Sequence, residues 1–587
     1  MATTTETIRK ATGGSFLFQD IEAGRVFTYE DLTDEHLDIG RTVDAFWATE
    51  VEPHLDGIRH QEPGLALKVL RKAAELGLTA LSIPERFGGM DMDLTSAMVV
   101  AEHLGKDGSY AGWQSTHTGI GTLPLVFFGN EDQKRKYLPK LAKVEMLAAY
   151  ALTEPLAGSD ALAARTRADL SEDGKHYILN GQKMWITNGG AADLFTVFAK
   201  VSGEKFTAFL VERKFPGVSS GAEEQKMGIK GSSTTAVYFD NVRIPVENVL
   251  GEIGRGHVIA FNILNVGRLK LGPAVLGKSK HILGICLKYA KQRKAFGSAI
   301  AEFGAMQHKL AEMAIRIYAA ESMTWRVVGS VEEHLRDSSS ALDPARAQMK
   351  ALEEFATECL MVKVYASETL DYVVDEGVQI HGGYGFHQDY TVERAYRDSR
   401  VNRIFEGTNE INRLIITGML LKRAARGGLE LIPAARAAIN ETLAHGHPAR
   451  SEVSNDELVH NAKKIALLTI GLAHEKYSDE LEKQQEIVMS ISDILMDAYA
   501  MESTLLRTMK LGVDAANATD MCSVILRDAM TRIETAARNV LGACSEGAAL
   551  RNNMSALRNL AQHEPIDAVQ TRRRIARRLI DEERYVV

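Results

Sequence analysis

The sequence contains few cysteines, and none of them is placed for a metal or a redox pair. Its 587 residues include four, which stand far apart and form no CxxC motif. Isolated cysteines of this kind suit a reducing compartment, where they behave as small apolar residues. The pattern argues against a disulfide scaffold and gives no metal ligands. The four are Cys286, Cys359, Cys522 and Cys544.

Long hydrophobic runs and a basic excess are missing as well. No stretch of about 18 uncharged apolar residues occurs, so we expect no membrane-spanning segment. The first residues, MATTTETIRKATGGSFLF, lack the apolar core of a signal peptide, which indicates a cytoplasmic protein. The formal net charge of −8 gives no electrostatic footprint for nucleic acid, so nucleic-acid binding is not expected.

The hydrophobic pattern changes three times along the chain. Residues 30–146 have apolar side chains at helical spacing, with short breaks. Between 147 and 250, short aromatic and β-branched runs alternate with Gly, Asn, Asp and Pro, which predicts strands of a small antiparallel sheet or barrel. Long amphipathic periodicity returns from 255 to 425, and it resumes after the polar segment 444–457.

These changes predict an α+β protein that is mainly helical. We expect an N-terminal helical domain (1–148), a middle antiparallel β domain (149–255), a four-helix bundle (256–428) and an additional C-terminal helical domain (429–587). A short internal echo supports the last division. YAAESMTWR at 318–326 and YAMESTLLR at 499–507 share Y-A-x-E-S-x-x-x-R, which suggests that the second bundle imitates the first.

One acidic residue has unusual neighbours. In RVNRIFEGTNEINRL, Glu406 lies between Phe405 and Gly407, just ahead of an amphipathic run. A carboxylate that is kept partly dry has a raised pKa and can act as a base. The alternative is a glutamate that only solubilises a helix, and that residue would suit polar neighbours better.

Two segments of the predicted β domain suit a flat ligand. YALTEPLAGSD (150–160) is a strand followed by a loop of small residues, whose backbone N–H groups can approach a phosphate or a flavin edge. In KMWITNGG, Trp185 and Thr187 lie two residues apart on one strand face, where they can stack on a ring and bond to it. An ordinary connection and a core tryptophan are the alternatives.

Two helix ends carry further candidates. AKQRKAFG offers Arg293 and Phe296 as a pyrophosphate clamp, although an arginine that stabilises a helix C-terminus is the alternative. QIHGGYGF has three glycines but not the G-x-G-x-x-G pattern, so a Rossmann site is rejected. His381 in this segment is expected to be structural rather than catalytic.

Together these five segments resemble the acyl-CoA dehydrogenase family, in the family's order and approximate spacing over residues 35–425. The additional helices after about 430 resemble the very-long-chain branch and its bacterial relatives in fatty-acid degradation. The resemblance implies FAD as the cofactor. It also implies a fatty acyl-CoA substrate of long or medium chain, and an electron-transfer flavoprotein as the electron acceptor.

The resemblance also implies the chemistry. Glu406 matches the base that removes the α-proton of the acyl-CoA, while the β-hydrogen leaves as a hydride to FAD and a trans-2-enoyl-CoA is formed. The Glu406 backbone N–H would help to polarise the thioester carbonyl. Some branches carry the base just before the arginine matched by Arg268, but that position is Gly267 here.

By the same resemblance, two sets of residues contact the cofactor and one contacts the substrate. Flavin contacts are assigned to Thr153, Ser159, Trp185, Thr187 and Thr408. Contacts to the FAD of a neighbouring subunit are assigned to Arg293, Phe296, Gln379, Gly382 and Gly383. Substrate contacts are assigned to Ser159, Arg268, Phe405 and Gly407.

The resemblance predicts a homodimer, because the additional domain would cover the face that other branches use to form tetramers. Gly119 and Gly121 match the base of the acyl pocket, where missing side chains leave space for a longer chain; close helix packing is the alternative. The basic tail, TRRRIARRLIDEERYVV, is expected to be an ion-paired solvated helix, with peripheral contact to the inner face of the membrane as the alternative. An acyl-CoA oxidase that uses oxygen, and an assembly role of the C-terminal domain, are the rival functions.

Overall fold

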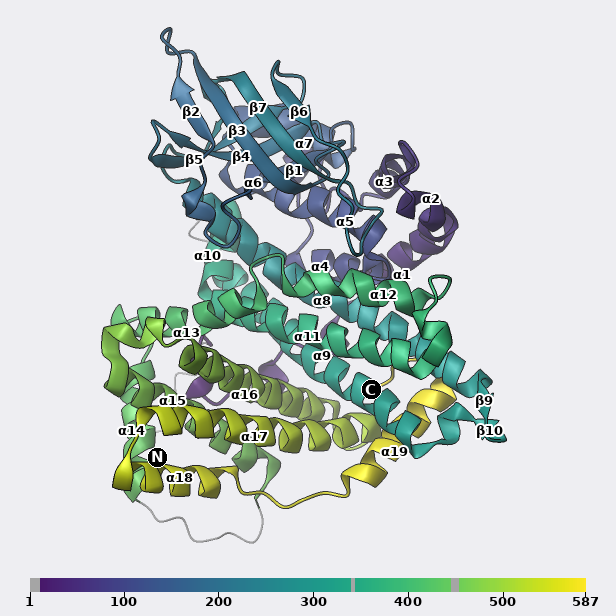
Figure 1. The fold of residues 1–587 in the computed structure, drawn as a ribbon, viewed down its shortest axis with the longest axis vertical. Coiled ribbons are helices and arrows are strands. Elements are labelled where there is room, and N and C mark those ends of the chain that lie inside the picture. Colours follow the sequence, from purple (N-terminus) through teal and green to yellow (C-terminus); the bar gives the residue numbers. More distant parts are fainter. Residues whose placement is uncertain (1–10, 339–343, 445–452) are drawn as a thin grey trace, which may run out of the picture.

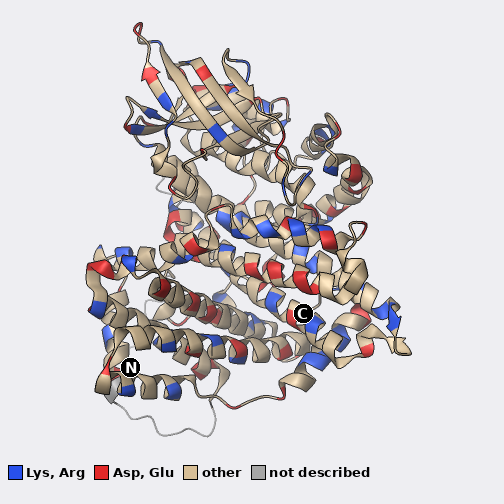
Figure 2. Ribbon diagram, in the orientation of Figure 1, with Lys and Arg blue, Asp and Glu red and all other residues tan. Residues whose placement is uncertain are grey.

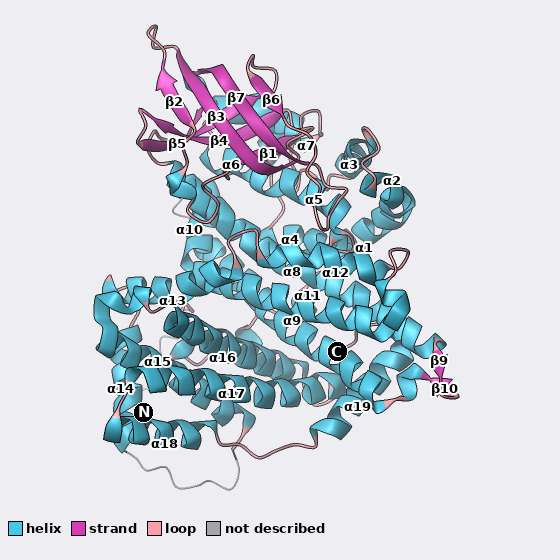
Figure 3. Ribbon diagram, viewed as in Figure 1, coloured by secondary structure: helices cyan, strands magenta, loops and turns pink. Residues whose placement is uncertain are grey.

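A computed structural model describes residues 11–338, 344–444 and 453–587 of the chain. The β domain lies at one end of the molecule, the C-terminal helices lie at the other, and long helices run between them (Figure 1). Figure 3 shows the strands of the β domain gathered at one end, with a small separate hairpin near α19 (Ala568–Glu582). The predicted order of helices, sheet, helices and more helices is confirmed. The first ten residues, and most of the polar segment 444–457, lie outside the described residues.

The N-terminal domain is a cluster of short helices that begin at polar capping residues. Thr33, Asp93 and Asn130 each accept a hydrogen bond from the backbone N–H three residues later, which starts α1, α4 and α7. The wide turn η7 (His117–Gly121) joins α5 to α6 and contains Gly119 with non-helical dihedral angles. The helices are α1 (Asp34–Phe46), α2 (Leu55–Arg59), α3 (Leu65–Glu75), α4 (Leu94–Leu104), α5 (Gly108–Thr116), α6 (Leu123–Phe128) and α7 (Glu131–Ala142).

The middle domain is a single eight-stranded sheet. Its order is β6-β7-β3-β2-β4-β5-β8, and β1 pairs with β4. The predicted all-antiparallel sheet is wrong in one respect, because β4 pairs in parallel with both β1 and β2. Alternation of apolar residues identifies a strand but carries no information about the direction of its partner. The strands are β1 (Ala148–Ala151), β2 (Arg167–Leu170), β3 (His176–Thr187), β4 (Leu194–Val201), β5 (Lys205–Glu212), β6 (Val218–Ser220), β7 (Thr234–Pro245) and β8 (Val249–Leu250).

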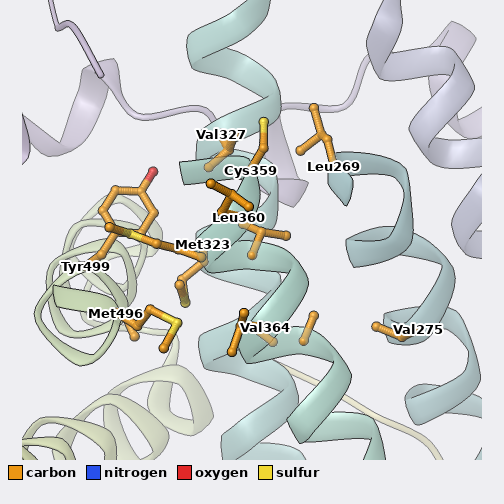
Figure 4. Packing of buried hydrophobic residues seen from close by; sticks show 14 of the residues in the cluster. Leu269, Val275, Met323, Val327, Cys359, Leu360, Val364, Met496 and Tyr499 are labelled. Carbon is orange, nitrogen blue, oxygen red and sulfur yellow. The ribbon is translucent and has the colours of Figure 1, made fainter. Parts of the chain in front are cut away.

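The central bundle is built on three long helices, α8, α9 and α11, with shorter helices around them. Figure 4 shows apolar side chains from α8, α9 and α11 meeting those of the C-terminal helix α16. The two helical domains therefore share one core. The helices are α8 (Gly256–Gln292), α9 (Gly304–Ser338), α10 (Pro344–Glu354), α11 (Ala356–His381), α12 (Thr391–Ser399) and α13 (Asn409–Ala425); a small hairpin, β9 (Lys294–Ala295) and β10 (Ser298–Ala299), follows α8.

Helix α8 is the one helix in the described part of the chain that is long and apolar enough, by length and composition, to cross a membrane. Of its most apolar window, 61% is buried inside the molecule. It packs against α11, α4 and α9, so these contacts account for its apolar character.

The C-terminal domain adds six helices. The amphipathic periodicity predicted after the polar segment 444–457 is confirmed, because most apolar side chains of α16 and α17 are buried. The helices are α14 (Leu431–Ala444), α15 (Asn455–Tyr477), α16 (Gln485–Leu511), α17 (Ala516–Cys544), α18 (Gly547–Ala561) and α19 (Ala568–Glu582).

The two copies of the sequence echo lie on α9 and α16, and they contact each other reciprocally. Arg326 of α9 pairs with Glu502 of α16 at 2.8 Å and lies 4.5 Å from the ring centre of Tyr499. In return, Arg507 of α16 pairs with Glu321 of α9 at 2.6 Å and lies 4.6 Å from a tyrosine ring of that copy. The repeated motif therefore forms the junction between the two helical domains.

The basic tail forms α19, and several of its arginines are ion-paired, as expected. Arg572 bonds to Glu312 of α9 and to Asp528 of α17, both at 2.6 Å. Two further arginines of α19 pair with Asp520. The tail is thus fastened to the bundle by acids from other helices rather than by the acids that follow it in sequence.

Candidate active site

Glu406 lies in the strained connection between α12 and α13. Its backbone is left-handed (φ 57°), and Gly407 follows with φ 79°. A non-glycine residue rarely adopts this conformation without a structural or functional reason. The Oε2 atom of Glu406 is buried and has no hydrogen-bond partner among the described residues. Burial raises the pKa of this carboxyl, and the charges of Arg268 and Lys363 lower it in part.

Three side chains hold the backbone of this turn. Arg268 Nε donates to the Glu406 carbonyl at 3.1 Å. Lys363 Nζ donates to the Gly407 carbonyl at 2.8 Å, and Asn412 Nδ2 donates to the same oxygen at 3.1 Å. Because both carbonyls are held by donors from α8, α11 and α13, the strained turn is fixed by three separate helices.

Helix α8 lies directly against the carboxylate of Glu406. A Cβ atom at Gly267 would come within 2.8 Å of Glu406 Oε2, so a larger residue there would displace the carboxylate. Phe405, which the sequence suggests as the shield for Glu406, is 39% exposed. Close packing of Gly267 therefore contributes directly to the burial of this carboxylate.

The predicted flavin contacts of the β domain gather around one end of β3. Trp185 is 55% exposed with φ 59°, and the register of β3 against β7 shifts between Lys183 and Ile186. The alternative of a core tryptophan is therefore wrong. Thr187 is half-buried on the same side, because Ile186 between them is buried. Thr153, also half-buried, accepts a hydrogen bond through its carbonyl from the residue before Trp185, at 2.9 Å.

A buried ion pair shapes the loop that follows β1. Lys183 Nζ bonds to Glu154 at 2.6 Å and to the carbonyl of Leu152 at 3.1 Å. Glu154 in turn accepts hydrogen bonds from the backbone N–H groups of residues 165 and 166. The loop between them is left open, since Ser159 is exposed and no atom lies within 4 Å of a Cβ at Gly158.

The sheet and the bundle meet beside the catalytic candidate. The hydroxyl of Tyr150, in β1, donates to the carbonyl of Ala260 in α8 at 3.4 Å. Tyr150 also lies near enough to interact electrostatically with Glu406 and Arg268. The predicted flavin loop therefore begins next to the helix that packs on Glu406.

The other five predicted FAD contacts form a second group at the far end of α11. Arg293, Gly382 and Gly383 line a cavity of about 650 Å³. Gln379 is exposed one turn before these glycines, and Phe296 is 98% exposed at the tip of the β9–β10 hairpin. The length of α11 between Lys363, beside Glu406, and Gly382 is roughly 28 Å at about 1.5 Å per residue.

Two further candidates have structural partners. His381 is buried, donates through Nδ1–H to the Gly377 carbonyl at 2.8 Å, and stacks on Tyr289 with ring centres 4.0 Å apart. This supports its expected structural role. Thr408 caps α13 by accepting from the backbone N–H of Ile411 at 3.2 Å.

No cluster of three or more metal-ligating side chains occurs within the described ranges.

Sequence analysis missed two polar residues that hold the Glu406 turn, Lys363 and Asn412. It also missed Lys270, which lies one helical turn after Gly267. Both lysines stand in apolar surroundings, in LMVKVYA and GRLKLG. Such positions can be identified in the sequence as a lysine with apolar residues directly before and after it, in a helix that is expected to be buried. The amine of such a lysine must find a partner inside the protein.

Comparison with known families decides the assignment. Three models of acyl-CoA dehydrogenase domains match: the N-terminal domain over 33–145, the middle domain over 149–242 and the C-terminal domain over 254–421. A second model with the description "Acyl-CoA dehydrogenase, C-terminal domain" matches residues 461–559. The chain belongs to the acyl-CoA dehydrogenase family. The predicted resemblance is thereby confirmed.

Individual acyl-CoA dehydrogenases are similar to this chain over different fractions of its length. A probable acyl-CoA dehydrogenase of Bacillus subtilis (strain 168) is 47% identical, with 98% of both chains covered. The mitochondrial very long-chain specific enzyme of Bos taurus is 36% identical over 84% of this chain and 75% of its own. The crystal structure of an acyl-CoA dehydrogenase complexed with FAD from Bacillus anthracis superposes with a TM-score of 0.95, at 46% identity, over 98% of this chain and 100% of that one.

A shorter relative marks the extra domain. The butyryl-CoA dehydrogenase of Megasphaera elsdenii is 33% identical with a TM-score of 0.60, and it covers 67% of this chain and 99% of its own. The remaining third of this chain therefore has no counterpart in that enzyme, as expected for a member with an additional domain.

Proposed function

We propose that this acyl-CoA dehydrogenase family member oxidises long- or medium-chain fatty acyl-CoA to trans-2-enoyl-CoA in fatty-acid β-oxidation, with FAD as cofactor and an electron-transfer flavoprotein as acceptor. The observation that carries the proposal is the state of Glu406. Its Oε2 atom is buried and has no hydrogen-bond partner among the described residues, and the residue is held in a strained turn by three helices. Such a group is poised to accept a proton.

The residues around Glu406 suit a flavin. An exposed indole at Trp185 offers a stacking surface, and Thr153 and Thr187, both half-buried, are close to it along the chain or through the hydrogen bond of the Thr153 carbonyl. The open loop at Gly158 leaves backbone N–H groups accessible to the ring edge. Bound FAD would supply the acceptor for the hydride that leaves the β-carbon.

The chain's own contribution is proton removal and positioning. Glu406 takes the α-proton, and the raised pKa of its carboxyl increases its strength as a base. Arg268 and Lys363 hold the carbonyls of residues 406 and 407, so the base keeps one orientation during the reaction. The buried setting also keeps water away from the reacting carbons.

An anaerobic titration tests the proposal. We expect palmitoyl-CoA to bleach the visible flavin band of the wild type but not that of Glu406→Gln, since the amide keeps the shape of the side chain and cannot take the proton. Glu410→Gln is the matched control, because Glu410 is exposed one turn later and should behave as wild type. Equal bleaching of the wild type and of Glu406→Gln would show that Glu406 is not the base.

Oxygen separates the proposal from its nearest rival. An acyl-CoA oxidase would produce stoichiometric hydrogen peroxide with oxygen as sole acceptor, whereas the proposed dehydrogenase would need an electron-transfer flavoprotein for rapid turnover. Measuring both rates on one preparation decides between them.

We further propose a cytoplasmic homodimer. The support is the separation of the two groups of predicted FAD contacts, since Gly382 lies roughly 28 Å along α11 from the residues beside Glu406. One cofactor would then use Glu406 of one chain and Arg293, Gly382 and Gly383 of the other. Peripheral membrane contact has less support, because arginines of α19 are already paired with acids of the bundle.

A further inference from the structure

Lys270 lies on the face of α8 that packs against the catalytic carboxylate. Gly267, three residues earlier, is the position that touches Glu406. Residues three apart on a helix are neighbours on one face, about 4.5 Å apart along the axis. Lys270 therefore lies about one turn beyond Gly267 on the same face of α8. Its Nζ donates to Thr118 Oγ1 in η7 at 3.0 Å.

The amine of Lys270 has no acidic partner within ion-pair distance in the described part of the chain. Lys183 shows the contrast, because its fully buried amine pairs with Glu154 at 2.6 Å. Burial lowers the pKa of Lys270 to about 8, yet the side chain keeps part of its accessible surface. This combination is expected of an amine that faces an internal space rather than packed protein.

The turn η7 provides that space at one glycine only. A Cβ at Gly119 would meet a single atom within 4 Å, Lys270 Nζ at 3.8 Å. A Cβ at Gly121 would instead lie 2.9 Å from Ala148, so this glycine allows close packing. Of the two glycines predicted to deepen the acyl pocket, only Gly119 leaves room for more atoms, and the nearest atom to that room is the Lys270 ammonium nitrogen.

We propose that Lys270 binds a carboxylate at the far end of the acyl group, so that the preferred substrates are mono-CoA thioesters of dicarboxylic acids. This inference rests on the proposed dehydrogenase function. An ammonium group has three donors, and Thr118 takes one of them. Two remain for the two oxygens of a carboxylate, whereas a methyl end would leave them unpaired inside the protein.

The neighbouring charges support an anionic partner. His117, in the same turn, is buried, and burial lowers its pKa to about 4, so it stays neutral at physiological pH. Its Nε2 and Nδ1 atoms are already used, on the Leu141 carbonyl and the Ala148 N–H respectively. A carboxylate brought to Lys270 therefore meets one positive charge and no fixed acid that repels it.

The test compares paired substrates in three proteins. Each pair has one chain length, with either a methyl or a carboxyl end: octanoyl- and suberoyl-CoA, dodecanoyl- and dodecanedioyl-CoA, palmitoyl- and hexadecanedioyl-CoA. For each pair, anaerobic bleaching gives the ratio of kcat/KM for the carboxyl over the methyl substrate. We expect the best ratio to exceed one in the wild type and to fall roughly tenfold or more in Lys270→Met. Lys288→Met, an exposed lysine of the same helix, should keep the wild-type ratio.

Each outcome has one meaning. If palmitoyl-CoA bleaches the wild type but no carboxyl substrate of any length is preferred, the inference is wrong and the dehydrogenase function stands. An unchanged ratio in Lys270→Met also overturns it. If neither kind of acyl-CoA bleaches the flavin, the proposed function itself fails. The affinities of the same ligand pairs for Glu406→Gln, with and without Lys270→Met, give a readout without turnover; equal affinities would again overturn the inference.

Discussion

At the residue scale, the ionisation of Glu406 is set by two opposing effects. Loss of solvent favours the neutral acid, while the positive charges of Arg268 and Lys363 favour the carboxylate. The net pKa is raised, so burial outweighs both cations. The cations nevertheless counteract part of the rise, so the pKa of Glu406 depends on their charges.

This balance predicts a pH effect of Lys363→Met. Only ionised Glu406 removes the proton, so the bleaching rate falls as the pH drops through the raised pKa. Removing the positive charge of Lys363 raises that pKa further, and we expect the acid midpoint of the rate to move up by about 1 pH unit. The comparison is made below pH 8, because burial lowers the pKa of Lys363 to about 8. Stopped-flow bleaching at several pH values measures the midpoint.

A purely structural role of Lys363 would give a different result. Loss of its bond to the Gly407 carbonyl alone would slow the reaction equally at every pH and leave the midpoint in place. Lys350→Met is the control for the substitution itself, since Lys350 is exposed on α10. A midpoint that matches the wild type would refute the electrostatic account.

At the element scale, periodicity predicted most helices and strands because it reports which face is buried. β4, Leu194–Val201, is the apolar run LFTVFAKV, within the range 147–250 where strands are predicted. The parallel partners of β4 were not predicted, since pairing direction depends on chain connections rather than on side-chain pattern. Lys270 and Lys363 were missed for a related reason: a charged letter in a helix normally indicates solvent, and only the fold shows that α8 and α11 are enclosed.

The contacts between α9 and α16 predict that replacing Arg326 in this junction lowers the free energy of unfolding more than replacing an exposed arginine, Arg538. Arg326→Met leaves Glu502 buried with only Lys463 as a cationic partner, and we expect a loss of about 2–3 kcal/mol in the free energy of unfolding. Arg538→Met removes an exposed pair with Glu534 and should cost less than about 0.5 kcal/mol. Urea unfolding followed by circular dichroism gives both values. Equal midpoints for the two variants would mean that the junction contributes little to stability.

At the scale of the whole molecule, the predicted FAD contacts do not form one site in a single chain. Figure 2 shows acidic and basic residues interspersed along the helices, so overall charge gives no argument for where a partner binds. The exposed Phe296 and the open glycines at the end of α11 are instead local features that suit a cofactor held from another chain. Geometry, rather than overall charge, is therefore the argument for the homodimer.

Complementation between two inactive variants tests this arrangement. Glu406→Gln lacks the base, and Arg293→Glu would repel the pyrophosphate while leaving Glu406 intact. In a mixed dimer, one of the two sites combines Glu406 of the second variant with Arg293 of the first, and that site is complete. After co-expression, half of the dimers should be mixed, and the mixture should reach about one quarter of wild-type activity. Each variant expressed alone should be nearly inactive. Two affinity tags, one on each variant, allow mixed dimers to be isolated. If the isolated mixed dimers are inactive, the residues around Glu406 and those around Gly382 do not share one cofactor. The group at Gly382 would then need another explanation.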